Sequence, residues 1–299
     1  MRTSLIDWIQ VPRDLETVGR SFKRKMFGLD NRSSYPLLSG DTFKYLSQLI
    51  LEGQINELDY DFPALQEFNG KIFAQAEPGS NATRILVQVC RSEIKFPNAD
   101  LIIHNGDVIP NPTEMLVLSN SFRNVYSVNW LGDTAIAAPL PIGLENRDKR
   151  RNGVPSDYLR EIKNGLPIPG QRDILLLAAF SLHTNFEKRS MALEYARSIP
   201  GAKIITKPIT PRQYRNLVLR SRFVLSPPGN GPDCHRTWEA LYLGATPIVH
   251  RESWPFHAHD LPVVQVDSWG EIELKIESYP AKINNSWKEI HYWIPPSVF

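Results

Sequence analysis

The sequence predicts an α/β protein of two Rossmann-like domains that face each other across a cleft. Three observations predict this class. The chain has 299 residues, which suits two domains of ordinary size better than one. Apolar runs alternate with amphipathic helical stretches along most of the chain, as in parallel α/β sheets. The segment 223–249 packs a strand, a glycine-rich turn, a helix and a second strand into one short unit.

The N-terminal domain is assigned to residues 1–147. Its first part gives few signals apart from an amphipathic helix predicted over Thr42–Leu51, which the run 39–41 (Ser-Gly-Asp) would begin. Beyond it, apolar runs bounded by Gly, Pro, Asn or Asp predict the strands of a buried parallel sheet. These strands are Arg84–Cys90, Asp100–His104, Val125–Asn129 and Ala137–Ile142.

The second domain is assigned to residues 148–275, and a C-terminal tail to residues 276–299. The stretch 146–170 is rich in charge, glycine and proline, which places the hinge there or just before it. A second α/β rhythm follows this stretch. Its elements are the strand Asp173–Phe180, the helix Phe186–Ser198, the strand Ala202–Thr206, the helix Pro211–Leu219, the strand Pro262–Val266 and two further helices over Trp269–Ser278 and Asn285–Ile290.

The segment 223–249 holds the strongest functional signal. Its first residues favour a strand, and the prolines and glycines over 227–232 stop both strand and helix. Asp233 stands where it would cap the following helix, which Gly244 ends before a strand over Thr246–Val249. Such a turn leaves backbone N–H groups free at a helix N-terminus, where a phosphate is favoured. We therefore expect a ligand site here.

Two charged residues of this predicted helix fit such a ligand. Arg236, in the first turn, would add a positive charge for a phosphate, and Glu239, one turn further on, would accept hydrogen bonds from a sugar. The alternative is an i, i+3 ion pair on an exposed helix face. The constrained turn favours the ligand site, because a solvated helix does not require it. Trp238 and Tyr242 lie on another face and are assigned to the core.

This segment resembles the nucleotide-sugar-binding half of exostosin-like glycosyltransferases. The resemblance lies in a serine-proline turn, an arginine, the run 239–241 (Glu-Ala-Leu) and a Gly-x-x-Pro pattern before a strand. The layout is similar, more loosely, in α1,3-fucosyltransferases and other transferases of the two-Rossmann-domain GT-B type. The close resemblance covers about a tenth of the chain, and a weaker likeness extends to 141–147 (PIGLENR) and 181–185 (SLHTN).

The resemblance implies a glycosyltransferase that moves a sugar from a nucleoside diphosphate sugar, with a UDP-sugar favoured, to a hydroxyl of a glycan acceptor. The second domain would bind the donor and the first the acceptor, and the tail would cross back to the first domain. In the family, the glutamate holds the ribose, while the turn and the arginine face the diphosphate. The resemblance also implies inversion at the anomeric carbon and a role in surface polysaccharide or glycan assembly. The matching positions are Glu239, Ser226, Gly229 and Arg236, joined by the backbone around Asn230 and Gly231.

Open parallel sheets bind ligands beyond the carboxyl ends of their strands, and two further loops of the second domain qualify. The first carries His183, Thr184 and Asn185, with Arg189 one helical turn later, and the resemblance makes this a wall of the donor site. A helix N-cap by Thr184 or Asn185 is equally open. Lys207 follows the next strand, where it would reach a phosphate or the base pocket, with a solvated surface lysine as the alternative.

Inverting transfer needs a base that takes the proton of the acceptor hydroxyl. His104 and Asp107 stand just beyond an apolar strand, and Gly106 permits a turn that would leave both facing the cleft. Either residue fits the base, with an Asx-type turn and a packed histidine as the alternative. Asp41 and Glu145 are assigned to the acceptor side, although Asp41 also fits the base or a helix cap.

No metal and no other cofactor are expected. Arg236, with the backbone N–H groups of the turn, would stabilise the departing diphosphate in place of a metal. The sequence DYD at 59–61 is formally the DxD pattern with which GT-A glycosyltransferases hold a divalent ion, but no strand precedes it, which indicates a solvated loop. Three histidines lack the HExxH spacing of a zinc site and are assigned to a loop beside the cleft. They are His250, His257 and His259.

Two other functional classes stay open. A GT-B module that has lost catalysis would bind a nucleotide or a glycan without consuming a donor. A GT-A transferase working through Asp59 and Asp61 would stop on removal of divalent ions, whereas the preferred enzyme would continue.

Composition bounds the remaining possibilities. A net charge of +2 gives no overall attraction to nucleic acid. Cys90 and Cys234 make no disulfide framework and match a reducing compartment. Because no eighteen apolar residues run together, we expect a cytoplasmic protein, in which the basic run Arg20–Lys25 permits peripheral membrane contact. The sequence predicts no oligomeric state.

Overall fold

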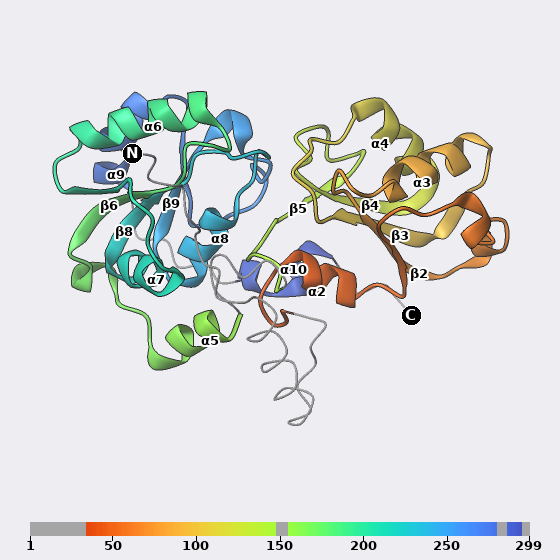
Figure 1. Cartoon of the computed structure of the whole chain (residues 1–299), viewed down its shortest axis with the longest axis horizontal. Helices are drawn as coiled ribbons and strands as arrows, with labels where there is room; N and C mark the ends of the chain where they lie inside the picture. Colours follow the sequence, from red (N-terminus) through yellow and green to blue (C-terminus); the bar gives the residue numbers. More distant parts are fainter. Residues whose placement is uncertain (1–33, 148–154, 280–285, 295–299) are drawn as a thin grey trace, which may run out of the picture.

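The computed structural model describes residues 34–147, 155–279 and 286–294. Within these ranges the chain is an α/β protein with two parallel five-stranded sheets, which Figure 1 shows in separate halves of the molecule. The strand order is β1-β2-β3-β4-β5 in the first sheet and β10-β9-β8-β6-β7 in the second. The centre of the predicted hinge, at 148–154, and the basic run at 20–25 lie outside the described residues.

In the first sheet each strand pairs with the next one along the chain, so the strand order never reverses. The helices α3 and α4 cover one face, where their apolar side chains form a cluster with those of the strands. The elements are α2 (Gly40–Tyr45), β1 (Leu49–Leu51), η1 (Glu57–Asp59), η2 (Ala64–Glu67), β2 (Gly70–Gln75), α3 (Ala82–Arg91), β3 (Phe96–His104), α4 (Pro112–Ser119), β4 (Phe122–Val128) and β5 (Ala138–Leu140).

Two predictions for this part of the chain are wrong. The run 84–90, predicted as a strand, lies within α3, because its apolar residues pack as a helix that buries Ile85, Leu86 and Val89 against the sheet. The helix predicted over 42–51 ends at Tyr45, and β1 occupies its last residues. The Ser39 cap is confirmed, since its side chain accepts a hydrogen bond from the Thr42 N–H. The other three strands are confirmed with shifted bounds: Asp100–His104 is the end of β3, Val125–Asn129 overlaps β4 up to Val128, and Ala137–Ile142 contains the shorter β5.

In the second sheet the predicted strands and helices over 173–266 are confirmed, with bounds that shift by at most two residues. The helix predicted over 269–278 is divided into η5 and α9. The elements are α5 (Pro155–Asn164), η3 (Pro169–Gln171), β6 (Ile174–Ala179), α6 (Phe186–Ser198), β7 (Ala202–Ile205), α7 (Pro211–Arg220), β8 (Ser221–Leu225), α8 (His235–Tyr242), β9 (Thr246–His250), η4 (Arg251–Ser253), β10 (Val264–Val266), η5 (Trp269–Glu271), α9 (Ile272–Ser278), η6 (Ser286–Lys288) and α10 (Ile290–Trp293).

The strand order of the second sheet reverses between β6 and β8. Leu176 of β6 lies opposite Ala202 of β7 on one side and opposite Phe223 of β8 on the other. Where the order reverses, successive loops leave the sheet in opposite directions and open a crevice at the carboxyl ends of the strands, which is where such sheets bind ligands. The loop after β6 and the glycine-rich turn after β8 therefore lie at the expected ligand position.

A shared apolar cluster joins the two sheets. It contains Ile102 and Tyr126 of the first sheet together with Val224 and Val249 of the second, and Trp238 of α8 is fully buried within it. A separate cluster lies on the other face of the second sheet, against α6 and α9. Because burial of apolar surface is the main favourable term in folding, the shared cluster holds the two halves together.

The described part of the tail, residues 286–294, packs on α8. The rings of Trp287 and Trp293 have their centroids 5.9 and 5.6 Å from that of Trp238. The Trp293 indole N–H donates a hydrogen bond to the Trp287 carbonyl over 2.7 Å. Both tryptophans belong to the cluster shared by the two sheets, whereas the expected crossing of the tail to the first domain stays a prediction. None of the helices in the described ranges is long and apolar enough to cross a membrane.

Candidate functional site

Residues 226–234 form the glycine-rich turn between β8 and α8, and α6 holds this turn from one side. Arg189 donates hydrogen bonds from Nε to the Pro228 carbonyl (2.9 Å) and from Nη1 to the Ser181 carbonyl (2.6 Å). Asn185, the N-cap of α6, donates from Nδ2 to the Gly229 carbonyl over 3.1 Å. A Cβ at Gly229 would lie 2.8 Å from Arg189 Nη2, so glycine is what permits this approach. Two residues of the predicted donor wall thus meet the turn.

Loops of the first sheet reach the same turn from the opposite side. Asp107, after β3, accepts a hydrogen bond from Asn230 Nδ2 over 3.0 Å, and Asn129, after β4, accepts one from the Asp233 N–H over 3.3 Å. A Cβ at Gly231 would lie 2.8 Å from Asn129 Nδ2 and 3.0 Å from the Asp107 carbonyl oxygen. The carboxyl ends of strands from both sheets therefore meet at the glycine-rich turn.

Arg189 and Arg236 place two positive charges beside one aromatic ring. Their guanidinium carbons lie 5.9 and 5.4 Å from the centroid of Phe180, and Arg236 Nε donates to the Ala179 carbonyl over 3.0 Å. Burial and the neighbouring charge of Arg236 lower the pKa of Arg189 to about 10. Within the described ranges neither arginine forms an ion pair with a carboxylate. A bound anion would relieve the repulsion between the two charges.

Glu239 is buried at 2% exposure rather than lying on a solvated helix face, so the alternative of an exposed ion pair with Arg236 is wrong. Burial raises the pKa of Glu239 to about 7 against the pull of the Arg236 charge, and the charge of Glu145 adds to the rise. Among the described residues, Oε1 of Glu239 has no hydrogen-bond partner. The side chains of Tyr158 and Tyr214 lie at this carboxyl and act against the rise of its pKa. A buried carboxyl oxygen without a donor is costly, so a ligand hydroxyl that reached Oε1 would be favoured.

Ser226 is bound inside the turn. Its Oγ lies 2.8 Å from Thr237 Oγ1 and 3.1 Å from the sulfur of Cys234, which is the N-cap of α8. The hydroxyl therefore fixes the start of α8, and with it the position of Arg236 in the first turn.

Asp233 is not the predicted cap of α8, because its carboxylate is used in a longer-range contact. Oδ2 accepts hydrogen bonds from the Ile142 N–H and from the Trp238 indole N–H, each over 2.8 Å. Oδ1 accepts one from the Cys234 N–H over 2.8 Å. Burial raises the pKa of Asp233 to about 7 despite these donors. The side chain ties α8 to the segment 141–147, which we call the crossing segment.

Of the two candidates for the base, His104 is locked in the fold. It is 1% exposed, its Nδ1 accepts a hydrogen bond from the Asn105 N–H over 2.7 Å, and its Nε2 donates to the Pro141 carbonyl over 3.0 Å. Burial lowers its pKa to about 4, which keeps the ring neutral. This geometry favours the packed histidine that the sequence left open. Asp107, in contrast, is exposed and lies at the glycine-rich turn.

The residues assigned to the acceptor side meet at the crossing segment. Asp41 accepts a hydrogen bond at Oδ2 from the Arg147 N–H over 2.7 Å, and its own N–H donates to Asn146 Oδ1 over 3.0 Å. His235, at the start of α8, donates from Nδ1 to the Gly143 carbonyl over 2.8 Å. Glu145 lies near enough to influence the pKa of Glu239. The crossing segment is thus held between the first sheet and the donor side.

The remaining donor candidates lie at different distances from the turn. Thr184 Oγ1 would be 3.7 Å from a Cβ at Gly229, so this residue borders the turn. His183 is exposed, and its N–H donates to Ser181 Oγ over 3.3 Å. Lys207 is exposed beyond the edge strand β7, and within the described ranges it forms no ion pair. The structure does not bring Lys207 to the turn.

The DYD sequence caps local turns. Asp59 Oδ2 accepts a hydrogen bond from the Asn56 N–H over 2.9 Å, and Asp61 Oδ1 accepts one from the Ala64 N–H over 3.1 Å. The described part of the chain contains no group of three or more His, Cys, Asp or Glu side chains arranged to hold a metal ion. Both aspartates are exposed and accept local backbone hydrogen bonds, as in the solvated loop that the sequence indicates.

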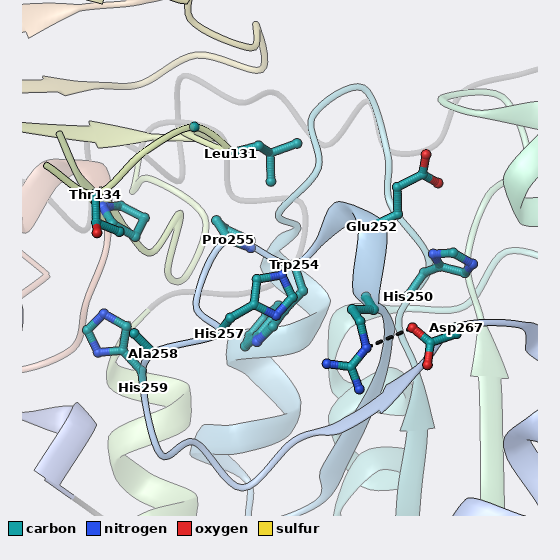
Figure 2. Close-up of a pocket in the computed structure, with 13 residues that line it drawn as sticks. Leu131, Thr134, His250, Glu252, Trp254, Pro255, His257, Ala258, His259 and Asp267 are labelled. Carbon is teal, nitrogen blue, oxygen red and sulfur yellow. Dashed lines mark hydrogen bonds and ion pairs between the residues drawn. The ribbon is translucent and has the colours of Figure 1, made fainter. Parts of the chain in front are cut away.

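A pocket of about 620 Å³ opens beside the loop after β9 (Figure 2), and none of the predicted donor residues belongs to its lining. Its walls come from the loops after β4, β9 and β10, so it too lies at the carboxyl ends of strands. The three histidines assigned to a loop beside the cleft, His250, His257 and His259, all line it. Their spacing in the sequence was the available signal, but only the fold places them opposite residues of the first sheet.

The sequence matches no model of a known protein family, and no curated protein matches it.

Proposed function

We propose that the chain is a GT-B-type glycosyltransferase that moves a sugar from a nucleoside diphosphate sugar, with a UDP-sugar favoured, to a hydroxyl of a glycan. The second sheet and its helices would bind the donor, and the first would bind the acceptor. One observation carries the proposal. Arg189 and Arg236 lie together at the reversal point of the second sheet without a carboxylate partner among the described residues. A diphosphate would neutralise both charges and occupy the expected ligand position.

The nucleoside would extend from the diphosphate toward Glu239. The ribose hydroxyls would donate hydrogen bonds to the carboxylate, whose Oε1 otherwise lacks a partner in the described part of the chain. Since a buried polar group without a partner rejects ligands that cannot supply one, this contact would favour nucleotides over inorganic pyrophosphate. This role agrees with what the exostosin-like resemblance implies for the residue.

In the proposed reaction the acceptor oxygen forms a bond with the anomeric carbon, and the bond from that carbon to the diphosphate oxygen breaks. The charge that develops on the leaving diphosphate would be stabilised by Arg236 and Arg189 without a metal. Asp107 would take the hydroxyl proton, because it lies at the glycine-rich turn while both nitrogens of His104 are already bonded. In-line attack of this kind inverts the anomeric carbon.

Binding of nucleoside diphosphates tests the donor site directly. UDP, GDP, CDP and ADP are titrated by calorimetry and thermal shift, with and without a chelator, since a ligand that binds only the folded state raises its stability. We expect selective, chelator-resistant binding of one diphosphate. Arg236→Ala should weaken it by at least about tenfold through the loss of a charge-assisted contact. Arg197→Ala, an exposed arginine at the far end of α6, is the matched control.

Three outcomes separate the alternatives. Equal binding by wild type and Arg236→Ala would remove the donor site. Nucleotide binding without release of UDP from any UDP-sugar and glycan pair would identify a catalytically inactive module. Loss of turnover with the chelator would favour a metal-dependent enzyme instead.

A further inference from the structure

The pocket of about 620 Å³ has a size typical of ligand sites, which span about 300–1,000 Å³. Leu131 and Thr134 form its wall on the side of the first sheet, and Figure 2 shows them facing the loop that carries Pro255 and His257. Trp254 also lines the pocket and stacks on Trp238, with centroids 6.5 Å apart. The site therefore rests on the cluster shared by both sheets and has a rigid base.

The histidines of this pocket are held in defined orientations. His257 lies with Nδ1 3.1 Å from Gln265 Oε1, an oxygen that also accepts from Arg251 Nη1 over 3.3 Å. Gln265 Oε1 is thus an acceptor, so His257 donates to it from Nδ1, and in the neutral ring Nε2 is then an acceptor. His259 packs on Trp293 with centroids 4.8 Å apart. Within the described ranges the buried N–H of Trp254 has no acceptor. The lining thus offers both donors and acceptors.

The charged groups of the lining are compensated. Arg251 is paired with Asp267 over 2.7 Å, and Glu252 lies 3.7 Å from the Lys188 ammonium of α6. Burial lowers the pKa of His259, which keeps its ring neutral at neutral pH. The one arginine of the lining is therefore already neutralised by a carboxylate, in contrast to Arg189 and Arg236 beside the glycine-rich turn. A ligand with many hydroxyls and no charge suits this lining, because each hydroxyl both donates and accepts a hydrogen bond.

We propose that this pocket binds an uncharged oligosaccharide and is the acceptor subsite of the proposed transfer, on which this inference rests. The apolar surfaces of Leu131 and Pro255 would contact the C–H faces of sugar rings. His257 Nε2 would accept a hydrogen bond from a sugar hydroxyl, and Thr134 would exchange one with another. The acceptor would thus be held by the second sheet as well as the first, beyond the contacts assigned to Asp41 and Glu145.

Binding of oligosaccharides without nucleotide tests the pocket by itself. Saturation-transfer NMR measures the dissociation constants of neutral trisaccharides of glucose, galactose, mannose and N-acetylglucosamine, with a hyaluronan tetrasaccharide as the acidic comparison. Leu131→Arg places a long charged side chain at the wall of the pocket, and Leu131 is 40% exposed, so the fold should tolerate it. Leu116→Arg, at 48% exposure on α4 and outside the lining, is the matched control. His257→Ala removes the proposed acceptor together with the rest of the imidazole ring.

We expect at least one neutral trisaccharide to bind wild type and Leu116→Arg equally. Leu131→Arg should weaken it by at least about tenfold and His257→Ala by a smaller factor, since each forfeits only the contacts made at its position. The inference is overturned if no neutral trisaccharide binds, if only the hyaluronan fragment binds, or if Leu131→Arg binds as wild type does. UDP affinity, measured on the same variants, separates the two proposals. The affinity for UDP should be the same in Leu131→Arg as in the wild type. If the wild type binds a neutral trisaccharide but no UDP, the donor site is contradicted and the oligosaccharide pocket is not.

Discussion

Asp107 and Asn230 are joined by a hydrogen bond of 3.0 Å between residues that lie 123 positions apart in the chain. The bond links the loop after β3 of the first sheet to the glycine-rich turn after β8 of the second. Asn230 thereby fixes one carboxylate oxygen of Asp107 at the glycine-rich turn, and among the described residues the other oxygen has no hydrogen bond. A base held in this way would need little reorganisation during transfer.

Asp107→Asn is expected to abolish the basic function while keeping the contact with Asn230, because the amide oxygen can still accept that hydrogen bond. The value of kcat should fall between about 10²-fold and 10⁴-fold, as is typical for the loss of a general base. The affinity for UDP should stay unchanged. Release of UDP from a UDP-sugar in the presence of acceptor measures the effect. Asp173→Asn, an exposed carboxylate before β6 that pairs with Arg220, is the control. If Asp107→Asn turned over at the wild-type rate, another residue would have to be the general base.

Gly231→Ala is expected to separate the two sides of the site. The added Cβ would meet Asn129 Nδ2 at 2.8 Å and the Asp107 carbonyl oxygen at 3.0 Å, so one side must move. Overpacking of this kind costs about 1–3 kcal/mol, and here it would be relieved by displacing the loops of the first sheet. We expect turnover to fall more than the affinity for UDP. Gly170→Ala, whose Cβ would meet nothing within 4 Å, should leave both unchanged. Equal losses of turnover and UDP affinity would contradict a role in joining the two sides.

The local patterns of the second half could be predicted from the sequence, whereas those of the first could be predicted only in part. The helix α6 begins and ends where its pattern indicates, since Asn185 caps it and apolar residues recur at helical spacing. The run 84–90 gave the wrong element, because a short apolar segment has the same composition in a buried strand and in a helix that packs closely on a sheet. No strand is predicted from the sequence over β2, whose place in the sheet is set by pairing with β1 and β3 on either side.

The candidate site was predictable where it depends on neighbouring residues. The turn, Arg236 and Glu239 belong to one continuous segment, and their proximity follows from a strand, a turn and a helix. Asp233 was assigned to a cap because nothing local indicates that Ile142, 91 residues away, would supply the N–H that its carboxylate accepts. The pairing of Arg189 with Arg236 around Phe180 depends likewise on how α6 and α8 pack at the sheet edge. Such contacts depend on the tertiary fold, and no periodic pattern in the sequence indicates them.

Trp293→Ala tests whether the tail is part of the cooperative fold. Trp293 is 4% exposed and contacts Trp238, Phe256 and His259 through its ring. Replacing a buried tryptophan by alanine typically costs about 3–5 kcal/mol, and we expect a loss of free energy of unfolding in this range by urea denaturation. Leu274→Ala, at 70% exposure on α9, should change it by less than about 0.5 kcal/mol. A similarly small effect of Trp293→Ala would show that the tail adds nothing to the stability of the cluster.

Glu239→Gln should change how stability depends on pH. Burial raises the pKa of Glu239 from 4.5 to about 7, so the folded protein holds a proton that the unfolded chain has already released between these pH values. The free energy of unfolding of the wild type should therefore fall as pH rises from 4.5 to 7, by up to about 3 kcal/mol for this group. The variant cannot titrate at this position. At each pH, the free energy of unfolding of the variant is subtracted from that of the wild type. The difference isolates the contribution of Glu239, because the opposite effect of His104 is common to both proteins.

The same substitution should change how nucleotide binding depends on pH. If ribose hydroxyls donate to the Glu239 carboxylate, binding requires the ionised form and releases a proton below pH 7. The affinity of the wild type for UDP should then fall by about tenfold for each pH unit below the pKa and stay level above it. Glu239→Gln should bind UDP more weakly than the wild type at pH 8. Its remaining dependence on pH should come only from the terminal phosphate of UDP, which titrates at about pH 6. Calorimetry in two buffers of different ionisation enthalpy measures the released proton. If the wild type and Glu239→Gln showed the same dependence of affinity on pH, the nucleotide would lie away from Glu239, and the donor site would rest on the diphosphate contacts alone.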